Sequence, residues 1–394
     1  MSLRSCRTSP CPSAIAPHLP QQPVVPDRSS RGVAHYRAAI ADRRELSQVG
    51  RGRCHELLVD GHHSLALPAK CVCLDQHGRV SFLALRNRNN VDELVYYQES
   101  NGGVVEEVID TGGFQHSGGS LALVVDGGEP CAIYRKDSEL SVRGNFQFDL
   151  CLAHCIPNGT WRKERTGVIG NLGRYPCPVM CDGCLTQIVH YQEGGYFIRE
   201  TSRDGNGWTD TPPLGRQGDG TALQSYATRQ GTTLFSFSSR RGGGAAVSTF
   251  LGWFENGRWQ RELVDPAAVA ILSATLLPDD SPIVLVRRDD GYALVRRSGQ
   301  DEWASKPVPG RTLFAESLTC DEQGCLRLLG QRAERRQLVL YELRDGNWSA
   351  TNVDSDIDSP DGSAGMRLTE GGDTTIFATI RDKNRSRVRV YRKR

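Results

Sequence analysis

A tryptophan recurs at a nearly constant interval along the chain, and this repeat restricts the possible folds more than any other feature. Five of the six tryptophans lie 44–51 residues apart, and most follow an Asn-Gly or Asp-Gly turn; they are Trp161, Trp208, Trp259, Trp303 and Trp348. Stepping back from Trp161 by 57 and then by 50 residues reaches Val104 and Cys54, each two residues after a glycine. Such periods are typical of repeat architectures whose units stack on their neighbours. The repeat therefore predicts seven copies of one unit.

A second series of signals has the same count. Short polar turns separate two β-rich runs in every unit, at 74–80, 125–131, 181–184, 229–232, 278–282, 320–325 and 370–374. Tight polar turns between such runs indicate hairpins. Each unit thus contains four antiparallel strands, A to D, in which the polar turn joins A to B and the Gly-x-Trp turn joins C to D. The sequence predicts an all-β fold, a seven-bladed β-propeller.

The two ends of the chain each supply part of one unit. The run 388–394 matches a strand C with no strand D after it, and Gly52–Asp60 matches a strand D with no strand C before it. Residues 52–394 number 343, or 49 for each of seven blades. We expect the N-terminal strand to complete the C-terminal blade, because ring closure removes exposed sheet edges.

The chain is expected to have two parts. Residues 1–50 are rich in Pro and Ser and predict a largely disordered N-terminal arm, with one short amphipathic helix at 34–48. Residues 51–394 form the propeller. The repeated tryptophans are expected to pack blade against blade rather than to contact a ligand, since repeat units bury their apolar faces on their neighbours.

Composition narrows the classes of partner. The 48 basic and 46 acidic residues nearly cancel, which argues against a nucleic-acid partner. No apolar run reaches the roughly 18 residues of a membrane span. Thirteen cysteines favour an oxidising, extracytoplasmic or secreted location, although residues 1–30 show no secretory signal. We expect a monomer without a cofactor.

Basic residues at the ends of the B strands form the predicted binding site. An arginine follows strand B in six units and a histidine in the third; the set is Arg86, Arg135, His190, Arg240, Arg287, Arg332 and Arg381. Loops that converge around one axis superpose their fields and attract anions. The guanidinium fork also suits carboxylate, sulfate or phosphate. The alternative is that these arginines are ordinary solvated surface residues.

The cysteines allow three interpretations. Cys177, Cys181 and Cys184 have CxxxCxxC spacing, the pattern that holds an iron–sulfur cluster in radical-SAM enzymes, but the chain lacks the βα alternation of that fold. A zinc site that adds Cys151, His154 and Cys155 is a second interpretation. Disulfides are preferred over any metal, and the candidates are Cys320, Cys325, Cys181, Cys184, Cys151 and Cys155.

The segment SRDGNGW at 202–208 is one residue short of the Ser-x-Asp-x-Gly-x-x-Trp box of sialidase-like propellers. Through this turn and its repeats, the chain over 52–394 resembles the BNR/Asp-box and related bacterial propeller families. The resemblance implies a sialidase-like glycosidase with an arginine cluster and a tyrosine nucleophile, for which Tyr134, Tyr191 and Tyr292 are candidates. Such catalytic domains usually have six blades, and here seven are predicted.

The leading functional hypothesis is a non-catalytic, lectin-like propeller that binds an acidic glycan or an acidic protein partner on the side of the B–C loops. The first alternative is a sialidase-like glycosidase or a polysaccharide lyase at the same channel mouth, which would need a carboxylate–Tyr or carboxylate–His pair there. The second is a cysteine-rich metal-binding protein. The sequence contains no GxSxG motif.

Overall fold

The computed structural model describes most of the chain from Arg53 onward. The described ranges are 53–59, 62–63, 69–75, 77–100, 103–114, 118–138, 147–156, 159–167, 171–192, 197–204, 207–215, 217–227, 233–240, 247–255, 258–298, 302–309, 313–332, 337–355, 364–369, 372–382 and 385–393. The predicted N-terminal arm and its helix at 34–48 lie outside these residues.

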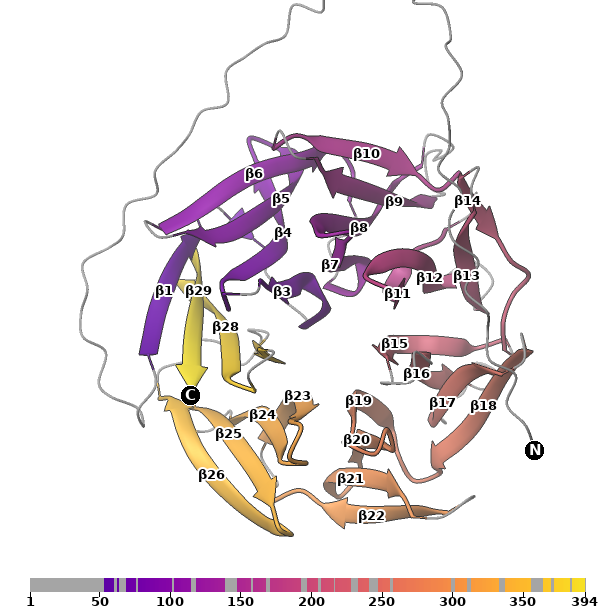
Figure 1. Ribbon diagram of the computed structural model, residues 1–394, viewed down its shortest axis with the longest axis vertical. Helices are drawn as coiled ribbons and strands as arrows, with labels where there is room; N and C mark the ends of the chain where they lie inside the picture. Colours follow the sequence, from indigo (N-terminus) through magenta and orange to yellow (C-terminus); the bar gives the residue numbers. More distant parts are fainter. Residues whose placement is uncertain are drawn as a thin grey trace, which may run out of the picture. The chain divides into compact units, whose positions relative to one another are not determined.

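The strands form seven small antiparallel sheets that stand around a central axis like the blades of a propeller (Figure 1). Six sheets have four strands, and the first has five because its innermost strand is split in two. The predicted seven-bladed β-propeller is confirmed. Short strands separated by tight turns follow from the glycine-rich turn chemistry of the repeats.

Each blade runs from an innermost strand near the axis to an outermost strand at the rim. Blade 1 has β2 (His62–His63) and β3 (Val72–Leu74) beside β4 (Val80–Arg88), then β5 (Val91–Ser100) and β6 (Gly103–Thr111). Blade 2 has β7 (Leu121–Asp126), β8 (Glu129–Asp137), β9 (Phe148–Cys155) and β10 (Trp161–Arg165). Blade 3 has β11 (Arg174–Cys181), β12 (Cys184–Gln192), β13 (Phe197–Asp204) and β14 (Gly207–Asp210).

The remaining blades repeat this order. Blade 4 has β15 (Asp219–Ala227), β16 (Thr233–Arg240), β17 (Val247–Glu255) and β18 (Arg258–Asp265). Blade 5 has β19 (Ala270–Leu276), β20 (Pro282–Arg288), β21 (Gly291–Arg297) and β22 (Trp303–Pro307). Blade 6 has β23 (Leu313–Cys320), β24 (Leu326–Arg332), β25 (Gln337–Arg344) and β26 (Asn347–Asp354). Single 3-10 turns, η1 (Ala69–Cys71) and η2 (Gly118–Ser120), precede β3 and β7.

Blade 7 contains both ends of the described chain. It has β27 (Ala364–Leu368), β28 (Thr374–Asp382) and β29 (Arg385–Lys393), and its outermost strand is β1 (Arg53–Val59). The strand β1 pairs with β29 in antiparallel register, from Arg53 opposite Arg392 to Val59 opposite Ser386. The predicted closure of the ring is confirmed, and it pairs an edge of β29 that would otherwise be open.

The core of the protein lies between blades rather than within them. There are seven clusters of buried apolar side chains among the described residues, and each contains residues of two adjacent blades. One cluster joins Val72 and Phe82 of blade 1 to Phe377 and Val388 of blade 7, across the point of closure. Each sheet therefore buries its apolar faces only when both neighbours are present.

The repeated tryptophans pack in these clusters, as predicted. Trp161 stacks at an angle against Tyr96 of the preceding blade, with ring centres 5.2 Å apart. Its indole N–H donates to the carboxylate of Glu107 of blade 1 at 2.8 Å. Trp303 makes the same bond to Glu262 of blade 4 at 2.9 Å. In these two blades the tryptophan is a blade-to-blade contact in which the polar edge of the indole also finds a partner.

Ion pairs between blades explain another repeated residue. An aspartate at the end of strand D contacts a basic residue of the next blade; the pairs are Asp110 with Lys136 at 2.8 Å, Asp265 with Arg288 at 2.8 Å and Asp354 with Arg389 at 2.6 Å. These carboxylates are largely buried. They therefore neutralise part of the positive charge that the sequence places near the B–C loops.

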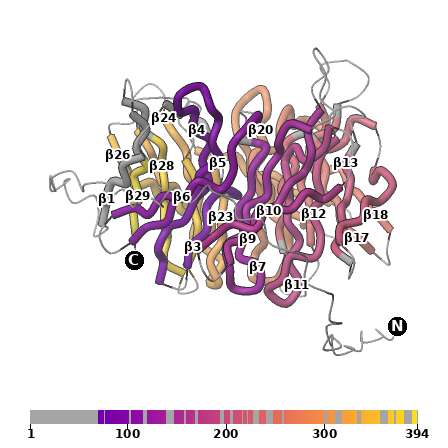
Figure 2. Tube along the Cα trace, turned by 90° about the horizontal axis from the view of Figure 1, so that it is seen from above, coloured from indigo at the N-terminus to yellow at the C-terminus, as the bar shows by residue number. Residues whose placement is uncertain are grey.

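Antiparallel hairpins divide the connections between the two sides of the ring. The β7–β8 and β11–β12 turns lie on one side and the β4–β5 and β20–β21 turns lie on the other (Figure 2). Thus the A–B and C–D turns share one side, which we call the A–B side. The B–C loops and the starts of the A strands share the other, which we call the B–C side.

The buried carboxylate of Asp110 should make stability depend on pH. Burial disfavours its ionisation, but hydrogen bonds from Lys136, Lys163 and Tyr134 together outweigh burial and hold the pKa of Asp110 below its usual value. A depressed pKa stabilises the fold above the pKa of the unfolded chain, and this contribution is lost as pH falls through the folded-state pKa. We expect Asp110→Asn to lower the free energy of unfolding by roughly 2 kcal/mol at neutral pH.

Urea unfolding of the wild-type and Asp110→Asn chains, from neutral to acid pH, measures this difference. It should shrink as the wild-type carboxyl becomes protonated. The control is Asp290→Asn, because Asp290 is an exposed aspartate of the β20–β21 turn, where a surface charge contributes little. A pH-independent difference for Asp110→Asn would contradict the assignment.

Candidate functional site

Three of the seven predicted binding positions are buried. Arg86 is 3% exposed, and Arg135 and His190 are 0% exposed. Arg86 crosses its own blade, where its Nε lies 2.6 Å from Glu93 of β5 and its Nη1 lies 2.6 Å from Glu106 of β6. The charge of Arg86 is therefore neutralised within blade 1.

Arg135 and His190 have structural contacts of a different kind. The guanidinium of Arg135 lies 4.1 Å above the ring of Phe148 and donates to the side-chain oxygen of Asn171. The Nε2 atom of His190 lies 3.0 Å from the hydroxyl of Thr201. Burial, with a smaller effect of nearby Arg199, lowers the pKa of His190 to about 3. His190 is therefore neutral at physiological pH and does not attract anions.

The other four positions differ among themselves. Arg287 of β20 is exposed. Arg332 of β24 donates to the hydroxyl of Tyr341 at 2.7 Å, so this contact leaves its positive charge uncompensated. The side chains of Arg240 and Arg381 lie outside the described residues. Of the predicted set, Arg287 therefore faces solvent and Arg332 is only partly covered.

The position of strand B explains why the predicted residues do not form one exposed ring. In every blade strand A lies between strand B and the axis. A side chain at the end of strand B therefore meets strand A, strand C or the next blade before it reaches the channel. The prediction placed loop charges around the axis without considering that they pair within their own blade, and it did not count carboxylates of strand D such as Glu106.

Cations do converge on the innermost strands, at residues that the sequence prediction missed. The Nζ atom of Lys70, in η1 of blade 1, lies 5.4 Å from the centre of the Tyr175 ring. The guanidinium of Arg174 lies 5.1 Å from the same ring centre. All three side chains are partly exposed. Two cations from blades 1 and 3 thus share one aromatic ring, an arrangement that is favourable for both cations.

Local backbone geometry produces this contact. A bulge interrupts the pairing of β11 between Arg174 and Cys177, and Tyr175 has a φ of 52°. The ring of Tyr175 packs on Gly119 of blade 2, where a Cβ atom would lie 2.7 Å from the ring. The ammonium of Lys70 donates to the carbonyl of Gly119 at 3.1 Å. Blades 1 and 3 therefore supply the group Lys70–Arg174–Tyr175, and Gly119 of blade 2 contacts both Lys70 and Tyr175. We call these three residues the inner cationic group.

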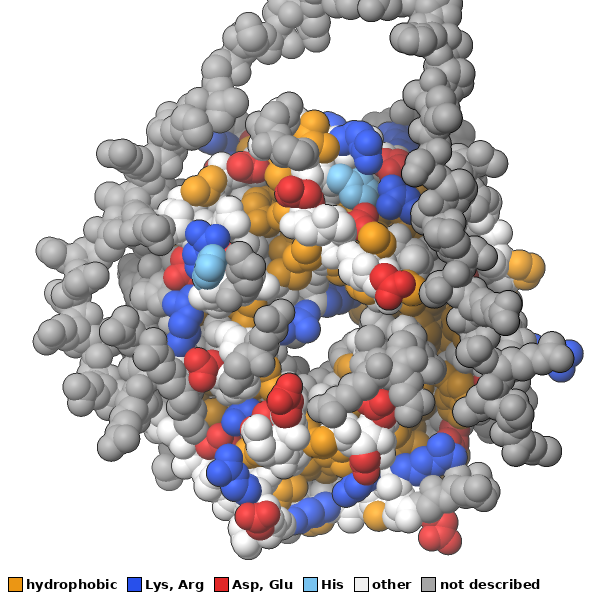
Figure 3. Space-filling view, viewed as in Figure 1, with side chains coloured by type: hydrophobic (Ala, Val, Ile, Leu, Met, Phe, Trp, Pro, Cys, Tyr) orange, Lys and Arg blue, Asp and Glu red, His pale blue; other side chains and the backbone are white. Residues whose placement is uncertain are grey.

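The surrounding wall adds little negative charge. Among the described side chains of the inner strands, the acidic ones are Asp219 and Asp126. Asp219 is fully buried and accepts two hydrogen bonds from Arg261, at 2.6 and 2.7 Å, and Asp126 ends β7 on the A–B side. Figure 3 shows an opening at the centre of the ring with Lys and Arg side chains at part of its edge.

The described carboxylate–Tyr pairs do not involve the inner strands, and the carboxylate–His pair of Asp126 with His154 joins the A–B end of β7 to β9, away from the B–C side. Tyr134, on strand B, donates to Asp110 at 2.9 Å and is 1% exposed. Tyr391 donates to Asp354 at the contact between blades 6 and 7. A sialidase-like or lyase-like pair at the channel mouth is therefore not found in the part of the chain that the structure describes.

The cysteines are free thiols at all ten positions described, so the disulfide prediction is not confirmed. Cys320 lies opposite Leu326 rather than opposite Cys325. Cys151 and Cys155 lie on the same strand, four residues or about 13 Å apart, beyond the reach of a disulfide with each other. Only Cys181 and Cys184 are direct cross-strand partners among the described cysteines.

Some buried thiols have a structural role at the inner strands. The thiol of Cys71 donates to the carbonyl of Leu121 at 3.4 Å, and that of Cys73 donates to the carbonyl of Leu123 at 3.1 Å. These bonds join blade 1 to blade 2. Burial raises the pKa of Cys71 to about 12, although Lys70 and Arg367 oppose the shift. The thiol therefore remains protonated and able to donate.

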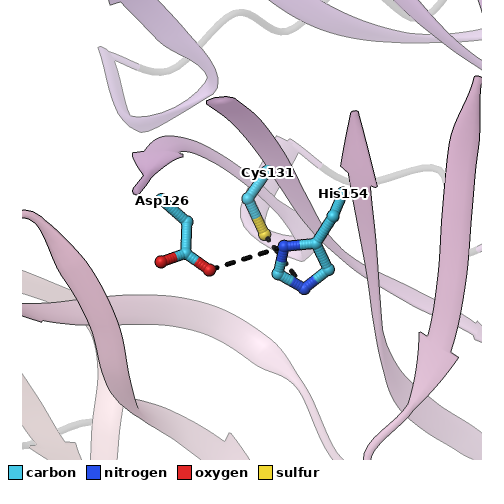
Figure 4. A group of neighbouring side chains, drawn as sticks. All are labelled: Asp126, Cys131 and His154. Carbon is cyan, nitrogen blue, oxygen red and sulfur yellow. Dashed lines mark hydrogen bonds and ion pairs between the residues drawn. The ribbon is translucent and has the colours of Figure 1, made fainter. Parts of the chain in front are cut away.

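Asp126, Cys131 and His154 of blade 2 form a separate group of polar side chains (Figure 4). It lies toward the A–B side, because Asp126 ends β7 at the A–B turn. The Nδ1 atom of His154 lies 3.4 Å from Asp126 Oδ2, and its Nε2 atom lies 3.9 Å from Cys131 Sγ. Of the predicted zinc ligands this group includes only His154; Asp126 and Cys131 were not predicted. The signal for them is the strand register, which places Cys131 directly opposite His154.

Comparison with known proteins supports the fold. No family model and no curated protein matches the chain. A streptogramin B lyase structure matches with a TM-score of 0.54 and 11% identity, over 86% of this chain and 97% of that one. Virginiamycin B lyase from Staphylococcus aureus matches at 0.56 and 11%, over 87% and 100%, and polysaccharide lyase Uly1 at 0.54 and 12%, over 85% and 92%.

At these identities the likeness shows the propeller fold alone. The resemblance to the BNR/Asp-box families is accordingly supported as architecture and not as family membership. Within the described residues, no helix has the length and apolar character that a membrane crossing requires.

Thiol reactivity should separate the exposed from the buried cysteines. Cys181 and Cys184 are exposed, whereas burial raises the pKa of both Cys71 and Cys177 to about 12. Because the thiolate is the reactive form, an alkylating reagent should modify Cys181 and Cys184 in the native protein and the other two only after unfolding. Mass spectrometry of proteolytic peptides gives the order of labelling, and equal rates at all four would contradict the burial described.

Proposed function

We propose that the protein is a binding propeller that recognises an acidic glycan at the B–C side of its channel, through the inner cationic group Lys70–Arg174–Tyr175. The observation that supports this proposal most is that two cations from different blades meet on one partly exposed aromatic ring. Preorganised cations in a partly enclosed site favour carboxylate or sulfate groups.

The predicted arginines contribute to the same side of the ring. Arg287 and Arg332 lie at the ends of the B strands of blades 5 and 6, and the inner cationic group lies near the starts of the A strands. We expect a long acidic chain to bind Lys70 and Arg174 through its central acidic groups. Groups farther along the same chain would then contact Arg287 and Arg332. A small anion would need only the inner cationic group.

A polysaccharide lyase is the second candidate function. Solved lyases share this fold, and one of them is a polysaccharide lyase. Burial lowers the pKa of Lys70, which makes its amine a better base near neutral pH. In this function Arg174 would neutralise a uronate carboxylate while Lys70 removes the adjacent proton. The glycosidic C–O bond then breaks, and the leaving oxygen takes a proton from the Lys70 ammonium or from water.

The binding proposal is tested with charge-removing variants and a sulfated or uronate-rich oligosaccharide. We expect Lys70→Gln and Arg174→Gln each to weaken binding by about tenfold, the loss of one charge-assisted contact. Binding should also weaken as salt is added. Arg258→Gln is the matched control, because Arg258 is an exposed arginine at a C–D turn on the A–B side. Salt-independent affinity, or an equal loss in Arg258→Gln, would contradict the proposal.

Lys70→Arg distinguishes binding from elimination. The arginine keeps the positive charge but cannot act as a base at neutral pH. If the protein is a lyase, this variant should retain binding and lose the unsaturated sugar product that elimination generates. If it is a binding propeller, no unsaturated product should form with the wild-type chain on any polysaccharide that it retains.

A further inference from the structure

One group of potential metal ligands lies away from the inner cationic group. Strands A, B and C of blade 2 each supply one side chain: Asp126 is the last residue of β7, Cys131 lies on β8 and His154 lies on β9. The register of the sheet pairs Cys131 with His154 directly. Figure 4 shows the carboxylate and the thiol both turned toward the imidazole.

The donor atoms are close enough to share one ion after a small adjustment. One ligand atom of each residue lies within 4.8 Å of the other two. Ligands of a tetrahedral zinc ion lie about 3.5 Å apart, as follows from bond lengths near 2.0–2.3 Å. One imidazole nitrogen must serve both the carboxylate and the thiol, and no pair of ligand atoms needs to close by more than about 1.3 Å.

The contacts around the group hold it in place. The backbone N–H of Leu185, in blade 3, donates to Asp126 Oδ1 at 2.8 Å and so fixes the carboxylate. Glu164 of β10 places its Oε2 atom 3.9 Å from His154 Nε2. Asp126 Oδ2 is also 3.4 Å from Arg203 Nη1, and Arg203 is 34% exposed. A bound cation would displace this arginine into solvent.

The same three residue types also occur as a nucleophile, a base and an orienting acid in cysteine hydrolases. Burial argues against that use here, because Cys131 is 0% exposed and His154 is 8% exposed. A substrate carbonyl group cannot reach such a thiol, whereas a metal ion can bind among buried side chains. Thiolate, imidazole and carboxylate together suit a borderline-soft divalent cation.

We propose that Asp126, Cys131 and His154 bind Zn²⁺, and that the side chain of Glu164 turns toward the ion as its fourth ligand. The ion would link strands A, B and C of blade 2 next to the contact with blade 3. The site is separate from the proposed glycan site and does not depend on it. Structural zinc sites contribute directly to the stability of the folded chain.

The test uses the full chain, stripped of metal with a chelator and then titrated with Zn²⁺ against a competing chelator. We expect one equivalent bound and a rise in Tm. His154→Gln and Cys131→Ala should each weaken binding by about 100-fold or more. Cys151→Ala is the matched control, because Cys151 is an equally buried cysteine of the same blade outside the group, and it should bind zinc like the wild type.

Two further variants test which side chains bind the zinc ion. The double variant Cys181→Ser/Cys184→Ser removes the exposed cysteine pair, an alternative zinc ligand set, and should leave the binding unchanged. Arg203→Gln removes the cation that competes for Asp126 and should increase zinc affinity several-fold. Loss of zinc in the double variant, unchanged binding in His154→Gln, or no zinc uptake by the wild type would overturn the proposal.

Discussion

The burial of apolar side chains between neighbouring blades is the interaction on which the rest of the structure depends. A single four-stranded sheet has two faces, and in this protein each face is covered by the next sheet of the ring. No blade can therefore be stable by itself, and the apolar contacts are complete only when the ring is closed. In five of the seven blades a tryptophan after the C–D turn contributes at these contacts, because its ring packs in the cluster between blades, as Trp161 and Trp303 do.

Polar contacts between blades determine which charges remain to act on a ligand. Asp110, Asp265 and Asp354 each pair with a basic residue of the following blade. Some of the positive charges near the B–C loops are thus neutralised by structural ion pairs. The number of basic residues in those loops therefore overstates the electrostatic field that a ligand meets. The inner strands are different because their described acidic side chains are few, and Asp219 is neutralised by Arg261. A cation there has more influence on a ligand in the channel.

The sequence was sufficient for the fold because its signals are local and repeated seven times. The Gly-x-Trp turn and the unmatched strand Gly52–Asp60 determine blade number and closure without knowledge of any long-range contact. The inner cationic group has no such signal. Lys70 and Arg174 are single residues in different blades, and they meet only because a bulge turns Tyr175 onto Gly119. The sequence correctly predicted that Arg86 lies near the B–C side of the ring. Its pairing with Glu93 and Glu106 depends on strand register, which a count of charges does not include.

The pairing of β1 with β29 has a consequence for how the protein forms. These strands are joined in space but are among the most distant in the chain, so the contact between them has a very large sequence separation. Non-local pairings of this kind slow folding. During synthesis the first strand must wait until the last has left the ribosome, and until then both carry unpaired backbone groups that invite association with other chains. The step that completes the ring is therefore the point up to which the unpaired edges of this protein are open to aggregation.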